Sequence, residues 1–249
     1  MRAIIIAAGQ GTRLRPYTAD RPKCMVSVAG KPILHHQIDA LRANGVDDIV
    51  VIGGYKQQGI VAPNIRTVSN REYQTNNILM SLFCAGPELV GDVIVSYGDI
   101  VYGPAVVETL MSTFFPSALV VDLDWAKTYQ GRTDHPIEQA ELCEARENGY
   151  VVRVGKEVGP DNACGEFIGL ARFDAAMIAR LWARYTDRLA LGDHKPYMNA
   201  PTFRKAYLTD LINDAIQNYE HFGIAPIEGG WREIDTVQDL ERLKSTTTW

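Results

Sequence analysis

A loop rich in glycine and arginine follows the first apolar segment of the chain. Residues 3–8 form a continuous apolar run, and Gly9 and Gly11 open the loop directly after it. Glycines allow the backbone to approach a phosphate closely and to aim N–H groups at it. Arg13 and Lys23 add fixed positive charge within the same loop. Backbone donors combined with two cations suit a triphosphate, so the loop predicts a phosphate-binding site.

Two widespread phosphate-binding motifs do not fit this loop. The dinucleotide fingerprint requires a third glycine where this chain has Leu14, and it requires an acidic residue after the next strand. The P-loop requires Ser or Thr after a Gly-Lys pair, and neither pair of this kind, at 30–31 and 155–156, is followed by one. A glycine-rich turn with two solvated cations is the plain alternative, although the whole string is more specific than such a turn requires.

Alternating strands and helices must position this loop. Short apolar runs predict buried strands over residues 3–8, 48–52, 92–97, 118–122 and 165–173. One-sided apolar patterns predict helices over residues 32–44, 77–85, 104–114, 174–190, 203–218 and 236–244. A β-ribbon over 138–154 and a short strand before the last helix complete the expected elements. This order predicts an α/β fold with a mostly parallel central sheet flanked by helices.

Composition limits the partners and the cellular location. The formal net charge is −5 without a dense basic run, which argues against nucleic acid or an anionic membrane as the main partner. The four cysteines form no zinc-type or C-x-x-C spacing, which is typical of reduced intracellular thiols. No apolar run approaches the ~18 residues of a membrane span, and no signal-peptide pattern is seen. We therefore expect a cytoplasmic protein, and the sequence leaves a homodimer open.

The loop also carries a longer pattern that resembles a known family. The string Ala7-Ala8-Gly9-x-Gly11-Thr12-Arg13-Leu14-x-Pro16-x-Thr18, closed by Pro22-Lys23, is similar to the signature of the sugar-nucleotidyltransferase superfamily. The resemblance implies a Rossmann-like nucleotidyltransferase fold in which Arg13 and Lys23 neutralise charge during catalysis. The expected nucleotide contacts are Ala8, Gly9, Gly11, Thr12, Gly54, Tyr73, Thr75, Asn76, Asn77, Ser81 and Gly98. The stretch 73–77 could instead be a plain helix cap.

Acidic residues from two segments are candidate metal ligands. Nucleotidyl transfer needs a cation across the phosphates, and Mg²⁺ prefers one or two carboxylates plus water. Glu233 and Asp235 share a face if their segment is extended. The family resemblance implies that Asp99 and Asp235 hold Mg²⁺, with Glu233 as a further candidate. Alternatively, Asp99 is a turn residue and Asp235 caps the last helix, a role that Thr236 could also fill.

Further segments resemble the phosphocholine-cytidylyltransferase-like branch of the superfamily. They are residues 73–77, 96–102, 121–125, 132–141, 155–156 and 165–169. Relatives in this branch use CTP with phosphocholine, 2-aminoethylphosphonate or phosphorylated glutamine. The resemblance therefore implies a magnesium-dependent cytidylyltransferase that transfers CMP from CTP to a small phosphate- or phosphonate-bearing acceptor and releases pyrophosphate. The alternatives are a sugar-1-phosphate nucleotidyltransferase that uses UTP, dTTP or GTP, and a non-catalytic nucleotide-binding sensor.

The acceptor of such a reaction carries a phosphate or phosphonate and often an amine. Lys156 is the expected anion contact, and Arg132 is a further acceptor contact. Trp125 and Tyr129 could face a cationic head group by cation–π attraction, with Glu166 as its counter-charge. As a plainer alternative, the two aromatic rings pack together and Glu166 pairs with a surface arginine.

We expect a single domain with a division of labour along the chain. The nucleotide is expected to bind residues of about 1–122 and the acceptor residues of about 123–230, with 231–249 as a closing metal-ligand segment and helix. Because the acceptor is already anionic at neutral pH, the reaction requires no general base. We accordingly expect a site without a functional histidine, with His135 in a loop before Pro136.

Overall fold

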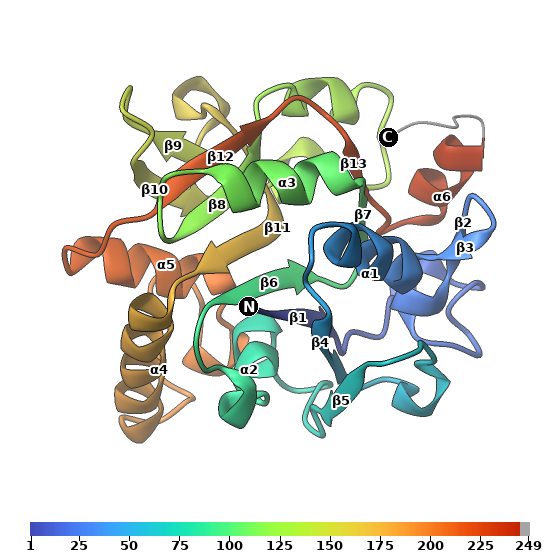
Figure 1. Ribbon diagram of the computed structural model, residues 1–249, viewed down its shortest axis with the longest axis horizontal. Helices are drawn as coiled ribbons and strands as arrows, with labels where there is room; N and C mark the ends of the chain where they lie inside the picture. Colours follow the sequence, from blue (N-terminus) through green and yellow to red (C-terminus); the bar gives the residue numbers. More distant parts are fainter. Residues whose placement is uncertain (245–249) are drawn as a thin grey trace.

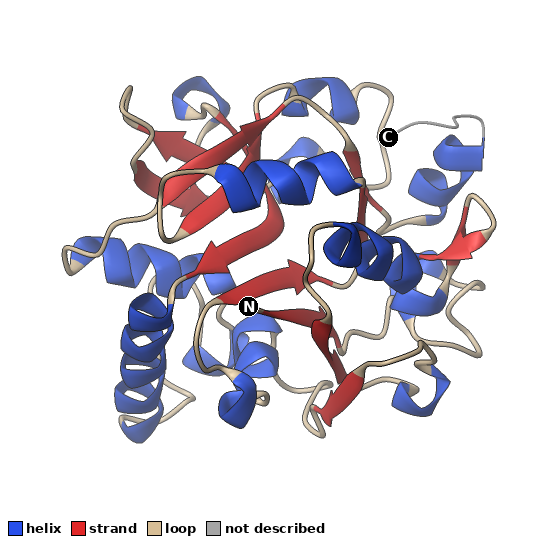
Figure 2. Ribbon diagram, in the orientation of Figure 1, coloured by secondary structure: helices blue, strands red, loops and turns tan. Residues whose placement is uncertain are grey.

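Runs of β-branched residues form the buried centre of the sheet in the computed structural model, which describes residues 1–244. The central strands are β1 (Arg2–Ala7), β4 (Asp48–Gly53) and β6 (Val93–Tyr97). Strand β1 pairs in parallel with both neighbours, and β5 (Arg66–Ser69) continues the parallel part beyond β4. Helices cover both faces of these strands (Figures 1 and 2), which explains why their apolar runs are continuous rather than alternating.

The other half of the sheet is largely antiparallel. The long strand β11 (Gly165–Phe173) runs antiparallel to β6, and the ribbon of β9 (Leu142–Ala145) and β10 (Val151–Gly155) follows it in the order β10-β9-β11-β6-β1-β4-β5. Strand β8 (Ala118–Asp122) pairs antiparallel with β11 and parallel with β12 (Gly223–Ile227). The predicted α/β fold, with its largely parallel central sheet and its β-ribbon, is confirmed.

Two small antiparallel pairs lie beside the main sheet. They are β2 (Ser27–Val28) with β3 (Lys31–Pro32), and β7 (Ile100–Tyr102) with β13 (Trp231–Glu233). These strands are too short for a period-two pattern, and the sequence did not predict them. The β7–β13 pair matters for the site because it brings residues after β6 next to residues near the end of the chain.

The α-helices of residues 1–244 are α1 (Ile33–Ala43), α2 (Ile78–Phe83), α3 (Pro104–Ser112), α4 (Ala175–Ala190), α5 (Leu208–Gln217) and α6 (Val237–Lys244). The first five form two layers over the main sheet, whereas α6 packs beside the β2–β3 hairpin. Ile4 and Ile6 of β1 pack into the core with α2, α4 and α5, whereas Ala3 and Ile5 pack into the core with α1 and α3. Alternate residues of one strand thus serve opposite layers. No helix within residues 1–244 has the length and apolar character needed to cross a membrane.

One predicted helix begins later than expected. Residues 203–205 form a separate 3₁₀ turn, and α5 starts only at Leu208. The cause is a capping box, because the Asp210 carboxylate accepts a hydrogen bond from the backbone N–H of Tyr207 at 2.8 Å. The apolar pattern alone does not reveal this start, since it continues through the 3₁₀ turn.

A fully buried carboxylate connects the end of β8 to the chain that leads into β13. Asp122 accepts hydrogen bonds from the Trp231 indole N–H at 2.7 Å and from the backbone N–H of Gly229 at 3.0 Å. It also accepts one from the backbone N–H of Asp124 at 3.0 Å. Asp122 therefore fixes where β13 starts, and with it the position of the acidic segment that follows.

Replacing Asp122 with alanine leaves these donors buried without an acceptor. We expect the free energy of unfolding to fall by about 2–4 kcal/mol in urea titrations, because unsatisfied buried donors are costly. The control is Asp124→Ala, which removes only a partly exposed ion pair with Lys127 and should cost less than about 1 kcal/mol. Equal losses of unfolding free energy in the two variants would contradict the role of Asp122 as a buried acceptor that fixes the start of β13.

Candidate active site

A cavity of about 400 Å³ opens where β1 and β6 end. Ligands of open α/β sheets bind at this edge, beyond the carboxyl ends of parallel strands. The predicted residues on its wall are Ala8, Gly9, Gly11, Thr12, Arg13, Lys23, Tyr73, Asn76, Asn77, Ser81, Asp99, Lys156, Glu166, Glu233 and Asp235. The fold thus brings the glycine-rich loop, the acidic residues and part of the predicted acceptor wall to one place.

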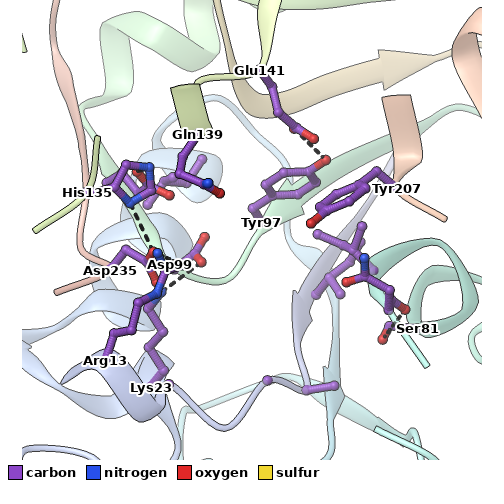
Figure 3. Close-up of a pocket in the computed structure, with 18 of the residues that line it drawn as sticks. Arg13, Lys23, Ser81, Tyr97, Asp99, His135, Gln139, Glu141, Tyr207 and Asp235 are labelled. Atoms are coloured by element: carbon purple, nitrogen blue, oxygen red, sulfur yellow. Dashed lines mark hydrogen bonds and ion pairs between the residues drawn. The ribbon is translucent and has the colours of Figure 1, made fainter. Parts of the chain in front are cut away.

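A buried ammonium group lies between two carboxylates at one end of the cavity (Figure 3). Lys23 Nζ is 2.9 Å from Asp99 Oδ2 and 2.7 Å from Asp235 Oδ1, and Arg13 also forms an ion pair with Asp235. Burial opposes the charge of Lys23, but the two carboxylates outweigh it and raise the pKa of the lysine. Burial likewise opposes the charge of Asp235, yet Lys23 and a hydrogen bond from His135 hold the pKa of Asp235 well below its usual range.

The geometry of the glycine-rich loop explains how it delivers these cations. Gly11 adopts a left-handed conformation with φ of 59° at the start of the 3₁₀ turn Thr12–Leu14. A Cβ atom at Gly11 would lie 3.1 Å from Cβ of Lys23, so a side chain here would crowd the lysine as well as strain the backbone. Thr18 closes the loop by donating from its hydroxyl to the Gly11 carbonyl at 2.8 Å.

A histidine belongs to the same end of the cavity, contrary to the expectation from the sequence. His135 is buried, with Nδ1 3.0 Å from Asp235 Oδ2 and Nε2 3.5 Å from Glu233 Oε2. These three side chains offer ligand atoms within 4.8 Å of one another, a spacing that could hold a metal ion. The structure thus places a histidine in the cavity, where the sequence led us to expect none. A loop residue has no periodicity to mark it, and its place within the 132–141 segment was the available signal.

Asp235 is free to face the cavity because its neighbour caps the last helix. The Thr236 hydroxyl accepts from the backbone N–H of Asp239 at 3.2 Å, and the Asp239 carboxylate accepts from the backbone N–H of Thr236 at 2.8 Å. This reciprocal capping confirms Thr236, rather than Asp235, as the cap of α6. Arg132 reinforces the turn, with Nε 2.7 Å from Asp239 and a terminal nitrogen 2.7 Å from Glu233.

Arg132, Trp125 and Tyr129 are predicted acceptor contacts that lie off the cavity wall. Arg132 is committed to the two carboxylates just described. Trp125 and Tyr129 pack against each other, with ring centroids 5.9 Å apart, in a small apolar cluster, so burial of their rings removes them from the cavity. Tyr129 nonetheless reaches the site indirectly, because its hydroxyl donates to Glu166 Oε1 at 2.6 Å. The expectation that these three side chains face the acceptor is corrected accordingly.

Gly54, Gly98 and Thr75 are predicted nucleotide contacts that do not line the cavity. A Cβ atom at Gly54 would lie 2.7 Å from the Ala8 carbonyl oxygen, and one at Gly98 would lie 2.6 Å from that of Ile6. The two glycines therefore permit close approach of neighbouring strands rather than contact with a ligand. The Thr75 hydroxyl donates to a local backbone carbonyl at 3.1 Å and is exposed.

The stretch before α2 is more than a plain helix cap. Asn77 occupies the cap position, but its side chain donates to the Lys205 carbonyl at 2.9 Å instead of capping α2. The buried Asn70 amide donates to Asn76 Oδ1 at 2.9 Å and to Ser81 Oγ at 2.8 Å. Asn70 was not predicted, and it holds two of the predicted wall residues in place.

The far wall of the cavity consists of Tyr97, Glu141, Lys156 and Tyr207, with Gln139 beside them. The Tyr97 hydroxyl donates to Glu141 Oε2 at 3.0 Å, as Figure 3 shows, and Lys156 Nζ lies 4.7 Å from the centre of the Tyr207 ring. Tyr97, Gln139 and Glu141 fall within segments that supported the family resemblance, although no role followed from the pattern. Tyr207 precedes α5, and only the fold brings it here.

Two wall carboxyl groups have pKa values raised to near neutral pH. Burial is the main cause that raises the pKa of Glu166 to about 8 and that of Glu141 to about 7. Nearby Lys156 and the Tyr97 hydroxyl partly offset this effect for Glu141. For Glu166, the hydrogen bond from Tyr129 likewise lowers the pKa and offsets part of the effect of burial. Both groups therefore change charge close to neutral pH.

The raised pKa of Glu166 makes stability depend on pH. Between the unfolded value of 4.5 and the folded value of about 8, the folded protein binds more protons, so this residue lowers stability as pH rises through that window. Glu166→Gln keeps the acceptor for Tyr129 but removes the charge. We compare the free energy of unfolding of the variant with that of the wild type. Between pH ~5 and pH ~8.5, we expect this difference to shift by about 1–4 kcal/mol in favour of the variant.

Urea titrations of both proteins at the two pH values measure this difference. Glu147→Gln is the matched control, because Glu147 is exposed in the turn between β9 and β10. A difference that does not vary with pH would show that Glu166 ionises normally in the fold.

Comparison with known protein families identifies one family that matches more than half of the chain. The family described as the MobA-like NTP transferase domain matches residues 3–147. The chain is 35% identical to the CTP:phosphoglutamine cytidylyltransferase of Campylobacter jejuni, over 97% of this chain and 98% of the relative. It is 26% identical to the choline-phosphate cytidylyltransferase of Streptococcus pneumoniae, over 98% and 97%. It is 28% identical to the 2-aminoethylphosphonate cytidylyltransferase of Lancefieldella rimae, over 96% and 89%.

Solved structures share the fold over the whole chain. The CTP:phosphocholine cytidylyltransferase of Streptococcus pneumoniae superposes with a TM-score of 0.70 at 24% identity, covering 98% of this chain and 97% of that chain. The inositol-1-phosphate CTP transferase of T. maritima superposes with a TM-score of 0.72 at 19% identity, covering 100% and 98%. The predicted Rossmann-like nucleotidyltransferase fold is thereby confirmed.

Proposed function

Because this chain belongs to the MobA-like NTP transferase domain family and is a nucleotidyltransferase, we propose that it transfers CMP from CTP to a small phosphate- or phosphonate-bearing acceptor and releases pyrophosphate. The observation that carries the proposal is the grouping of Arg13, Lys23, Asp99 and Asp235 at one end of the cavity. Two cations beside two carboxylates match the needs of a bound triphosphate and its counter-ion. The cytidylyltransferase relatives favour CTP over other nucleotides.

The donor set of this end fits Mg²⁺. The carboxylates of Asp99, Asp235 and Glu233 line the cavity together, and hard oxygen ligands are those that Mg²⁺ prefers. When bound, the ion supplies positive charge to the phosphates and increases their electrophilicity. We propose Asp99 and Asp235 as its ligands, with Glu233 as a further one.

The proposed reaction forms one phosphorus–oxygen bond and breaks another. An oxygen of the acceptor phosphate attacks the α-phosphorus of CTP, and the bond to the β-phosphate oxygen breaks as pyrophosphate leaves. Arg13 and Lys23 bind the phosphates and stabilise the charge that develops on the leaving group. The attacking oxygen is already anionic, so the role of His135 in the proposal is to hold Asp235 by the contact at 3.0 Å.

The second half of the chain supplies the proposed acceptor site. Lys156 and Glu166 on the cavity wall belong to residues 123–230, whereas the cations and Asp99 belong to residues 1–122. A cation and a carboxylate in one cavity complement an acceptor with a phosphate at one end and an amine at the other. In the proposed division, residues 231–244 close the site, and residues 245–249 of the predicted closing segment lie outside the described residues.

Pyrophosphate release tests the proposed function. We would incubate the protein with each of CTP, UTP, dTTP and GTP against phosphoethanolamine, phosphocholine, 2-aminoethylphosphonate and sugar 1-phosphates, with and without Mg²⁺. Release that requires CTP, Mg²⁺ and a small amino-bearing acceptor supports the proposal. Turnover only with sugar 1-phosphates would contradict the proposed acceptor and indicate a sugar-1-phosphate nucleotidyltransferase. Nucleotide binding without turnover would indicate a non-catalytic sensor.

Substitution of the cation or the carboxylate tests the catalytic assignment. We expect Lys23→Ala and Asp99→Ala each to lower kcat on the order of 10²-fold or more, because each removes charge aimed at the phosphates. Initial rates of pyrophosphate release at saturating substrates give kcat. Lys31→Ala serves as the control. Lys31 lies in the β2–β3 hairpin, and its replacement removes an exposed ion pair with Asp39 of α1. Near-normal turnover in either site variant would refute the assignment.

The position of Lys23 also predicts competition with the metal. Its ammonium already neutralises both proposed ligands in the nucleotide-free protein. We therefore expect Lys23→Met to bind Mn²⁺, used as a probe for Mg²⁺, about tenfold or more tightly than the wild type in the absence of nucleotide, because Asp99 loses its cation and Asp235 keeps only Arg13. Electron paramagnetic resonance titration of free Mn²⁺ measures this affinity. Unchanged or weaker binding would show that the two carboxylates do not form the metal site.

A further inference from the structure

One carboxylate on the cavity wall has an oxygen without a hydrogen-bond partner in the described part of the chain. Glu166 is only 5% exposed, and its Oε1 accepts the hydrogen bond from Tyr129 at 2.6 Å. Its Oε2 is buried and has no hydrogen-bond partner among residues 1–244. A buried acceptor without a donor is costly. Because Glu166 also lines the cavity, a bound molecule is the natural source of the missing donor.

The surroundings of Glu166 hold this oxygen in a fixed position. Glu166 lies on β11 opposite Asp122 of β8 and Leu142 of β9, so its backbone is fixed on both sides. Its partner Tyr129 packs against Trp125 and beneath the guanidinium group of Arg132, 5.3 Å from the ring centre. A carboxylate pinned at one oxygen presents the other in a set direction, which is a requirement for discrimination between similar ligands.

Primary and quaternary ammonium groups meet such an oxygen differently. A primary ammonium brings a positive charge and three N–H donors, so it can satisfy Glu166 Oε2 directly. A quaternary ammonium brings the same charge but surrounds it with methyl groups, and the oxygen remains without a donor. The aromatic rings on the wall, such as Tyr97 and Phe167, attract both kinds of cation and therefore do not separate them.

We propose that Glu166 makes this site selective for acceptors that carry a primary ammonium group over those that carry a quaternary one. The inference rests on the proposed function, since it concerns the acceptor of that reaction. Lys156 lines the same cavity and complements the phosphate or phosphonate of the acceptor. The matching substrate class is an aminoalkyl phosphate or phosphonate, which carries both charged groups in one molecule.

A pair of ligands that differ only in three methyl groups tests the selectivity. Isothermal titration calorimetry at pH ~9, where Glu166 with its pKa of about 8 is ionised, would measure binding of phosphoethanolamine and phosphocholine to the wild type and to Glu166→Gln, both loaded with Mg²⁺ and a non-hydrolysable CTP analogue. We expect the wild type to bind phosphoethanolamine about tenfold or more tightly, which corresponds to one unsatisfied buried acceptor. In Glu166→Gln the two affinities should differ by less than about threefold, because the charged acceptor is gone.

Controls separate this inference from the proposed function. Propyl phosphate, which lacks the ammonium group, gives the contribution of the phosphate alone, and Glu147→Gln in the exposed β9–β10 turn should keep the wild-type ratio. Equal binding of the two ammonium ligands by the wild type overturns the inference, as does failure of both to bind or a ratio that persists in Glu166→Gln. Normal discrimination without pyrophosphate release from CTP would contradict the proposed function alone.

Discussion

The ammonium group of Lys23 between Asp99 and Asp235 is the interaction on which the rest of the site depends. The three residues come from the loop after β1, the turn between β6 and β7, and the segment after β13. A buried ammonium is tolerated only when carboxylates surround it, and removal of one partner leaves an uncompensated charge. The cluster therefore sets the relative positions of three segments that are distant in the sequence.

A second set of contacts holds the late segment in register with the sheet. Asp122 fixes Trp231 at the start of β13, and the reciprocal capping of Thr236 and Asp239 fixes the start of α6. Between these two anchors, Asp235 points to the cavity. Asp122, Thr236 and Asp239 thus make the structural contacts of this segment. Asp235, which faces the cavity, does not cap the helix.

The sequence predicts the parts of this protein that depend on local patterns. The apolar runs of β1, β8 and β11, the helices and the glycine-rich loop are recognisable because period and composition determine them. Contacts between distant segments leave no such signal: the pairing of β7 with β13, the place of His135 beside Asp235, and Tyr207 on the far wall depend on the tertiary fold. Trp125 and Tyr129 illustrate the opposite error, because aromatic residues near a site suggest contact with a ligand, whereas burial in an apolar cluster suits them equally well.

The division of the sheet into a parallel and an antiparallel half has a consequence for how such an enzyme can diversify. The glycine-rich loop and Asp99 follow the parallel strands β1 and β6, whereas Lys156 and Glu166 belong to the antiparallel strands and the turns beside them. Substitutions in the ribbon and along β11 can reshape one half of the cavity while the cation cluster keeps its geometry. Under the proposed division of the cavity, evolution and protein engineering can therefore exchange one co-substrate for another without rebuilding the machinery for the nucleotide.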